Sequence, residues 1–121
     1  MSRLQHANVV IPKGSTAAVA PFYADVLGLR PIDKPEALDP SGAWFDVDGY
    51  AQVHLSERDG ERHPDAHFAL VVDDLAEVLR RVEAAGAPWT EQDDVFGGRR
   101  GFTRDPAGNR IELLERSGSL A

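Results

Sequence analysis

The chain contains no cysteine, which excludes both a disulfide framework and a metal site built from thiolates. It has no apolar run near the roughly 18 residues that a membrane span requires, and residues 1–6 contain no apolar signal core. We therefore expect a soluble, cytoplasmic protein with no membrane partner. Basic residues are also scarce, with 13 Lys and Arg against 20 Asp and Glu, and this net charge of -7 argues against nucleic acid as a partner.

What is present is a repeat inside a chain of 121 residues, of which 42% are hydrophobic, enough to bury a core. The segment HANVVI at 6–11 resembles HFALVV at 67–72, and QVHL at 52–55 resembles RIEL at 110–113. A charged segment at 56–65 separates the two copies. We expect a single domain over residues 1–121, made of one module over about 3–58 and a second over about 65–116.

The repeat places side chains that can bind metals at matching positions. His6 and His54 are separated by 48 residues in the first half, and His67 and Glu112 by 45 in the second. Each half therefore offers two potential ligands on matching strands. A pseudo-symmetric site with four ligands is the simplest physical interpretation of this spacing.

The first half begins with a short apolar run at 4–11, which predicts a largely buried strand. Turn and N-cap residues at 13–16 precede a helical pattern that Gly28 can terminate. Pro21 removes a backbone donor within that pattern, so we expect the helix to start close to it or to bend there.

A hairpin should follow, with strands over 43–47 and 50–55 on either side of an Asp-Gly pair. A two-residue type I′ turn at this pair would place Ala43 opposite His54. It would also put Phe45 on the same face of the sheet as His54.

The second half begins at His67 with a strand, followed by the clearest helix of the chain. Asp73 or Asp74 can cap this helix, and Gly86 follows its end. A short strand near Trp89 precedes two strands joined across 105–108, where Asp, Pro and Gly suit a type I turn. Each half is thus predicted to be a strand, a helix and three strands.

These halves, with FYADVLGL at 22–29 and DPAGNRIEL at 105–113, resemble the vicinal oxygen chelate superfamily. That superfamily includes glyoxalase I, extradiol dioxygenases, fosfomycin-modifying thiol transferases and bleomycin-resistance proteins. Over residues 3–116 the resemblance implies an α+β fold, in which two repeated βαβββ modules form a cup-shaped mixed sheet. It further implies a divalent metal in the cup, and a homodimer whose sites are shared between subunits.

Carried over by position, the metal ligands implied by the resemblance are His6, His54, His67 and Glu112. Glyoxalase I usually has Glu at the position of His54, and in the thiol transferases that position does not bind metal. Three imidazoles and one carboxylate suit zinc, nickel, cobalt or iron better than magnesium or calcium, and manganese stays open if His54 is not a ligand. An unpaired carboxylate facing imidazoles is costly without a cation. The alternative is that Glu112 pairs with an arginine, such as Arg100 or Arg110, and that the histidines bond to their neighbours.

The function implied is that of a glyoxalase-like isomerase or lyase acting on a small oxygenated substrate, which the metal chelates through adjacent oxygens. Glu112 or His54 would assist proton transfer. The candidates for contact with the substrate are Asn8, Gln52, Trp44, Phe45, Arg100 and Phe102. Strand aromatics can equally be plain core, and Arg100 can equally belong to a solvated loop edge.

Three alternatives stay open at this point. One is a metal-free drug-binding or ligand-binding protein similar to bleomycin-resistance proteins. Another is an extradiol-type dioxygenase, with iron on His6, His67 and Glu112. The last is a non-catalytic metal-binding accessory protein.

Overall fold

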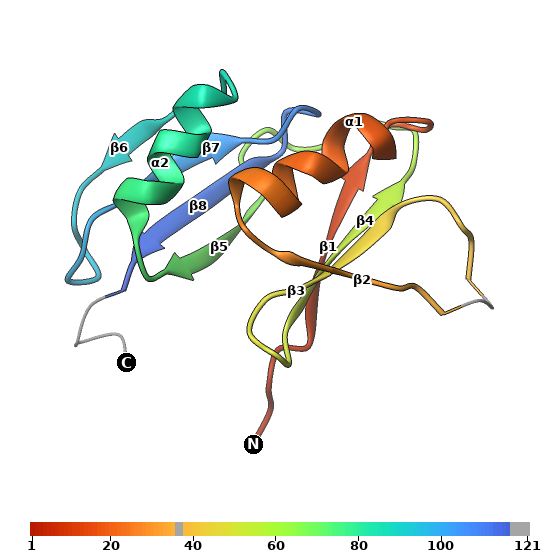
Figure 1. Ribbon diagram of the computed structural model, residues 1–121, viewed down its shortest axis with the longest axis horizontal. Helices are drawn as coiled ribbons and strands as arrows, with labels where there is room; N and C mark the ends of the chain where they lie inside the picture. The colour runs from red at the N-terminus through yellow and green to blue at the C-terminus, as the bar shows by residue number, and fades with distance from the viewer. Residues whose placement is uncertain (36–37, 117–121) are drawn as a thin grey trace. The chain divides into compact units, whose positions relative to one another are not determined.

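The computed structural model describes residues 1–35 and 38–116 (Figure 1). Each half forms a four-stranded sheet with a helical segment, in the predicted order of one strand, one helix and three strands. The chain divides into two compact units, residues 1–61 and 62–121, whose boundary falls in the charged segment. The α+β class and the repeated βαβββ modules are therefore confirmed. Within the described residues, none of the helices is long and apolar enough to cross a bilayer.

The first unit is a mixed sheet with a helical segment against one face. Its strands, in their order across the sheet, are β1 (His6–Ile11), β4 (Gln52–Glu57), β3 (Ala43–Asp46) and β2 (Arg30–Ile32). β1 and β4 run parallel, and the other two pairs are antiparallel. The helical segment is α1 (Thr16–Pro21) continued by the π-helix η1 (Phe22–Val26). Tyr23 of η1 stacks on Phe45, which marks the helix-covered face as the core.

The helix begins at Thr16, so of the two alternatives predicted for Pro21, a helix start close to this residue is not observed. Pro21 has no amide hydrogen to donate, and the α pattern gives way to a π pattern directly after it. Leu27 N–H then donates to the Phe22 carbonyl, five residues back, at 3.0 Å. Gly28 follows with φ of 76°, which is the left-handed conformation predicted for the residue after the helix.

The predicted register of the hairpin is wrong by one residue. Val47 N–H bonds to the Ala51 carbonyl, so the loop between them is longer than two residues, and Gly49 supplies a φ of 92° within it. Because side chains alternate between faces, this shift exchanges the neighbours of His54. Trp44 is its partner across the ladder, and Phe45 lies on the opposite face with 2% exposure.

The second unit repeats this plan with a single regular helix (Figure 1). Its strands, in order across the sheet, are β5 (His67–Val72), β8 (Arg110–Glu115), β7 (Arg100–Arg104) and β6 (Thr90–Gln92). Helix α2 (Leu75–Ala84) has apolar residues at helical spacing on one face, and Leu75, Val78 and Val82 of this face are buried. Gly108 N–H bonds to the Asp105 carbonyl at 2.9 Å, which closes the predicted turn between β7 and β8.

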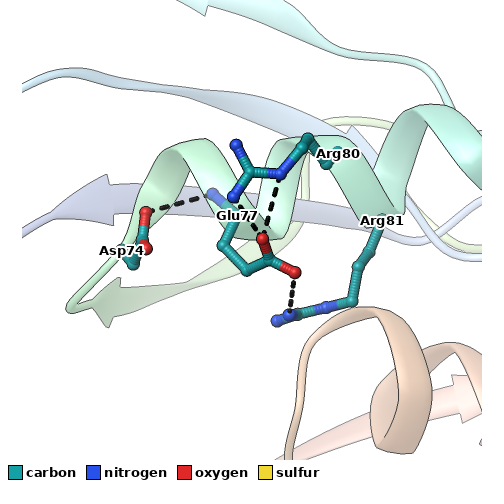
Figure 2. Close-up of polar contacts among 4 residues, drawn as sticks. All are labelled: Asp74, Glu77, Arg80 and Arg81. Carbon is teal, nitrogen blue, oxygen red and sulfur yellow. Dashed lines mark hydrogen bonds and ion pairs between the residues drawn. The ribbon is translucent and has the colours of Figure 1, made fainter.

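A carboxylate supports the start of each helix. Asp74 accepts from Glu77 N–H at 3.1 Å, as predicted for an N-cap, and Figure 2 shows this contact beside the Glu77 ion pairs. The first helix has no side-chain cap at Ser15 itself. Instead Glu57, at the end of β4, accepts from Gly14 N–H at 2.9 Å and from the Thr16 hydroxyl at 2.6 Å.

The two faces of each sheet differ in kind because successive strand residues alternate between them. The face toward the helix holds the apolar residues, such as Val53 and Leu55 in the first unit and Ile111 and Leu113 in the second. The opposite face holds the candidate metal ligands in both units. We call this second surface the histidine face.

Candidate functional site

In the first unit, three rings lie one on another across three neighbouring strands. Trp44 of β3 stacks on His54 of β4 with ring centroids 3.8 Å apart, and His54 stacks on His6 of β1 at 4.1 Å. His54 is enclosed between the other two and is only 7% exposed. Burial, and then the nearby charge of His6, lower the pKa of His54 to about 4, so its ring is neutral at neutral pH.

Glutamine oxygens orient both imidazoles of this pair. Nδ1 of His6 donates to Oε1 of Gln5 at 2.6 Å, and Nε2 of His54 donates to Oε1 of Gln52 at 2.7 Å. A neutral imidazole has one donor nitrogen and one acceptor nitrogen. In the neutral rings, the lone pairs therefore lie on Nε2 of His6 and on Nδ1 of His54. Histidines that bind metals are oriented in this way, through a hydrogen bond from the other nitrogen.

The second unit brings His67 and Glu112 together at the equivalent positions. β1 pairs His6 with Gln52, two residues before His54, and β5 pairs His67 with Arg110, two residues before Glu112. His67 Nε2 lies 3.4 Å from Glu112 Oε1. The repeat detected in the sequence is thus reproduced residue by residue in the two ladders.

His67 directs a lone pair at this carboxylate when its ring is neutral. Nδ1 of His67 donates to the Asp65 carbonyl at 2.9 Å, and a carbonyl can only accept, so Nε2 is the acceptor nitrogen of the neutral ring. A lone pair facing a carboxylate oxygen is repulsive. A positive charge between the two groups, such as a bound cation, would remove this repulsion.

Glu112 is also paired with an arginine, which corrects one argument made from the sequence. Nη1 of Arg100 lies 3.0 Å from Oε2 of Glu112, and the two side chains are 15% and 9% exposed. Nε of Arg100 is held by the Asp93 carbonyl at 2.7 Å. The carboxylate is therefore not unpaired, and its burial alone does not require a metal. Arg100 therefore contacts a candidate ligand and is not part of a solvated loop edge.

The donor chemistry fits a divalent metal, and each unit supplies two donors. Neutral imidazole nitrogens and a carboxylate oxygen suit the transition metals named above. Within the described ranges, however, no cluster of three or more His, Asp or Glu side chains could hold an ion by itself. Each unit by itself brings together two candidate ligands, and a metal at Glu112 would have to displace Arg100.

The remaining predicted contact residues fall on both faces. Asn8 is exposed on the histidine face, where its Oδ1 accepts from the Ser56 hydroxyl at 2.6 Å. Gln52 orients His54, and the ring edge of Phe102 meets His67 with centroids 5.1 Å apart. Phe45 lies in the core on the other face.

Two of the cavities lined by described residues each lie within one unit. The larger, about 700 Å³, lies between the α1–η1 segment and the β2–β3 region of the first unit; Trp44 and Phe45 contribute to its wall. The smaller, about 170 Å³, lies in the second unit and is lined in part by Phe102, Arg104 and Arg110.

Sequence reasoning did not assign a binding role to these two arginines. The available signal was their spacing on two predicted strands. Arg104 lies two residues after Phe102, and Arg110 lies two residues before Glu112. Residues two apart on a strand share a face of the sheet. The orienting contacts of Gln5 and Asp65 left no comparable signal.

The sequence of this chain matches one protein family and a plant protein. A family model described as the Glyoxalase/Bleomycin resistance protein/Dioxygenase superfamily matches residues 3–113. A chloroplastic protein of Arabidopsis thaliana, described as a probable lactoylglutathione lyase, is 31% identical over 122 residues, covering 90% of this chain. The chain spans only 35% of the length of that protein.

Several solved structures have a fold similar to that of this chain. A protein from Bacillus anthracis described as a member of the glyoxalase family is 27% identical, with a TM-score of 0.86 and 97% of each chain covered. Lactoylglutathione lyase from Agrobacterium tumefaciens is 26% identical, with a TM-score of 0.69, covering 99% of this chain and 96% of its own. TnmS3, an antibiotic-binding protein from a Streptomyces species, has a TM-score of 0.75 at 18% identity, with 97% and 98% covered, which shows the shared fold alone.

Proposed function

Because the chain belongs to the glyoxalase, bleomycin resistance protein and dioxygenase superfamily, we propose that it is a glyoxalase-like enzyme of the lyase or isomerase type. It depends on a divalent metal and acts on a small oxygenated substrate. The observation that carries the proposal is the paired placement of His6 with His54 and of His67 with Glu112, in the same register of the two ladders. The relatives described as lactoylglutathione lyases support the reaction class.

The proposed ligands are His6, His54, His67 and Glu112, which together bind one zinc, nickel, cobalt, iron or manganese ion. Two pairs of ligands are needed, and one chain or two chains of a homodimer supply them. Size-exclusion chromatography with light scattering, run with and without metal, distinguishes these cases. A metal-dependent dimer supports the shared site.

A metal held by these residues would supply Lewis-acid chemistry, which stabilises negative charge on substrate oxygens. Of the two candidates for proton transfer, Glu112 is preferred, because its carboxylate is not enclosed between rings and lies beside His67. His54 is fixed between two rings and bonded to Gln52, so it has little freedom to move a proton and suits a ligand role.

The test is metal titration of chain freed of metal by a chelator, followed by elemental analysis. Wild type is expected to bind a stoichiometric ion, and His6→Ala and His67→Ala are expected to lose it. His63→Ala is the matched control, because His63 is exposed in the charged segment and its Nδ1 only accepts from Asp65 N–H. Equal metal content in all four proteins would remove the ligand assignment.

A second function is favoured by one observation, the Arg100–Glu112 pair, which neutralises the carboxylate without a metal. On that account the chain is a metal-free ligand-binding protein. Absence of stoichiometric metal from wild type, together with retained binding of a small molecule, would select it. Stoichiometric iron with oxygen consumption on a catechol would instead select the dioxygenase.

A further inference from the structure

The histidine face of the second unit carries an excess of positive charge. On β7 and β8 this face holds Arg100, Arg104 and Arg110 against the one carboxylate of Glu112. The chain as a whole has a net charge of -7, so this concentration of arginine runs against its composition. Because Arg100 is paired with Glu112, the other two arginines supply the excess.

These two arginines line a small polar cavity. Its volume is about 170 Å³, and Thr90, Gln92 and Phe102 also contribute to its wall. Sites that enclose a whole drug-sized ligand measure roughly 300–1,000 Å³. The cavity therefore suits one functional group of a ligand rather than an entire molecule.

Arg110 is the residue best placed to bind an anion there. Its Cζ lies 3.5 Å from the ring centroid of Phe102, and in the described part of the chain no carboxylate forms an ion pair with it. Arg104 is more restricted, since Nη1 donates to the Gly108 carbonyl at 2.9 Å. A guanidinium stacked on a ring keeps N–H donors for bidentate contact with a carboxylate or phosphate. Phe102 also meets His67, so the cavity adjoins the candidate metal ligands.

The first unit lacks this arrangement at the equivalent positions. The ladders match Arg104 with Asp46 and Arg110 with Gln52. Asp46 forms an ion pair with Arg30 at 3.5 Å, and Gln52 orients His54. The positive cavity is therefore a specific departure of the second unit from the repeat.

We propose that this cavity binds one oxyanion group of the substrate, a carboxylate or a phosphate, through Arg110 with Gln92 as a further polar contact. The inference names the substrate class of the proposed function and rests on that function for the reaction. Anion binding itself requires only the second unit's own residues. It is therefore tested on chain from which metal has been removed.

The experiment titrates the chelator-treated full chain with inorganic phosphate and, separately, with acetate, at constant ionic strength, following backbone amide signals by NMR. Arg110→Gln should weaken binding of the preferred anion by at least about tenfold, because charge-assisted hydrogen bonds are lost. Arg110→Lys, which keeps the charge without the planar fork, should fall between. Arg80→Gln is the matched control, because this substitution removes the same charge from an arginine that is exposed on α2.

A loss confined to the Arg110 variants supports the site, and the preferred anion identifies the group. Binding that is equally strong in all variants, or absent from wild type, overturns it. Amide spectra of each variant verify that the fold is kept. Failure of the metal proposal would be seen separately, as unchanged metal content in the His67→Ala and His63→Ala proteins, with anion binding intact.

Discussion

Replacing Arg100 by Met should have opposite effects on the metal-free chain and on metal binding. In the metal-free chain, Arg100 is the guanidinium partner of Glu112, at 3.0 Å, and the two side chains are 15% and 9% exposed. Removing one partner of a fully buried pair costs about 3–5 kcal/mol, whereas exposed pairs contribute about 1 kcal/mol or less. This pair is mostly buried, but His67 stays near the carboxylate, so we expect a loss of about 2 kcal/mol.

The assay is urea unfolding of chelator-treated protein. For an m-value of about 2 kcal/mol per molar, the expected loss lowers the midpoint by about 1 M. The Arg99→Met control should change it far less, because Arg99 and its partner Glu91 are both about half exposed. The double variant Arg100→Met, Glu112→Gln should lose less than the sum of the single variants, since no charge is then left buried.

Metal affinity should rise in the same Arg100→Met protein, because the ion no longer competes with the guanidinium for Glu112. Release of about 1.4 kcal/mol of competing interaction corresponds to a tenfold gain in affinity. Calorimetric titration measures this gain directly. An unchanged unfolding midpoint together with unchanged metal affinity would refute the competition between Arg100 and the ion.

Further predictions concern the framework of the site. Glu57→Gln should destabilise the first unit at neutral pH, because hydrogen bonds from the Thr16 hydroxyl and from backbone N–H groups hold the pKa of Glu57 below its ordinary value. The stability that the Glu57 carboxylate contributes is therefore present above about pH 4.5 and is lost as the pH falls through the pKa of the folded state. At that low pH the urea midpoints of variant and wild type should converge. Phe45→Ala should cost about 3–5 kcal/mol in urea unfolding, since Phe45 is core, and a near-neutral result would contradict the observed register. Asp74→Ala should cost about 1 kcal/mol through loss of the cap of α2, measurable as a lower thermal midpoint. Gly101→Ala should cost about 1–3 kcal/mol, because a methyl group there meets the Thr90 carbonyl oxygen and the ring of Trp89. A thermal midpoint equal to that of wild type would argue against these close contacts.

The register of the hairpin could not be predicted from the sequence. The Asp-Gly pair favours a two-residue turn by local preference. In the structure Asp48 Oδ1 accepts from Tyr50 and Ala51 N–H groups, at 3.0 and 2.8 Å, and this stabilises a longer loop. Because this loop is one residue longer than predicted, Trp44 is the ladder partner of His54, and Phe45 lies on the core face of the sheet.

The sequence by itself determined the repeat, the order of elements and the two pairs of candidate ligands, because these depend on strand alternation and on turn chemistry within short segments. The cap at Asp74 and the turn at 105–108 were predictable for the same reason. The tertiary structure alone decided that Arg100 neutralises Glu112 and that Arg110 lies on Phe102. Those contacts join side chains of neighbouring strands, and which rotamer each arginine adopts depends on carbonyls and rings that only the folded sheet brings within reach.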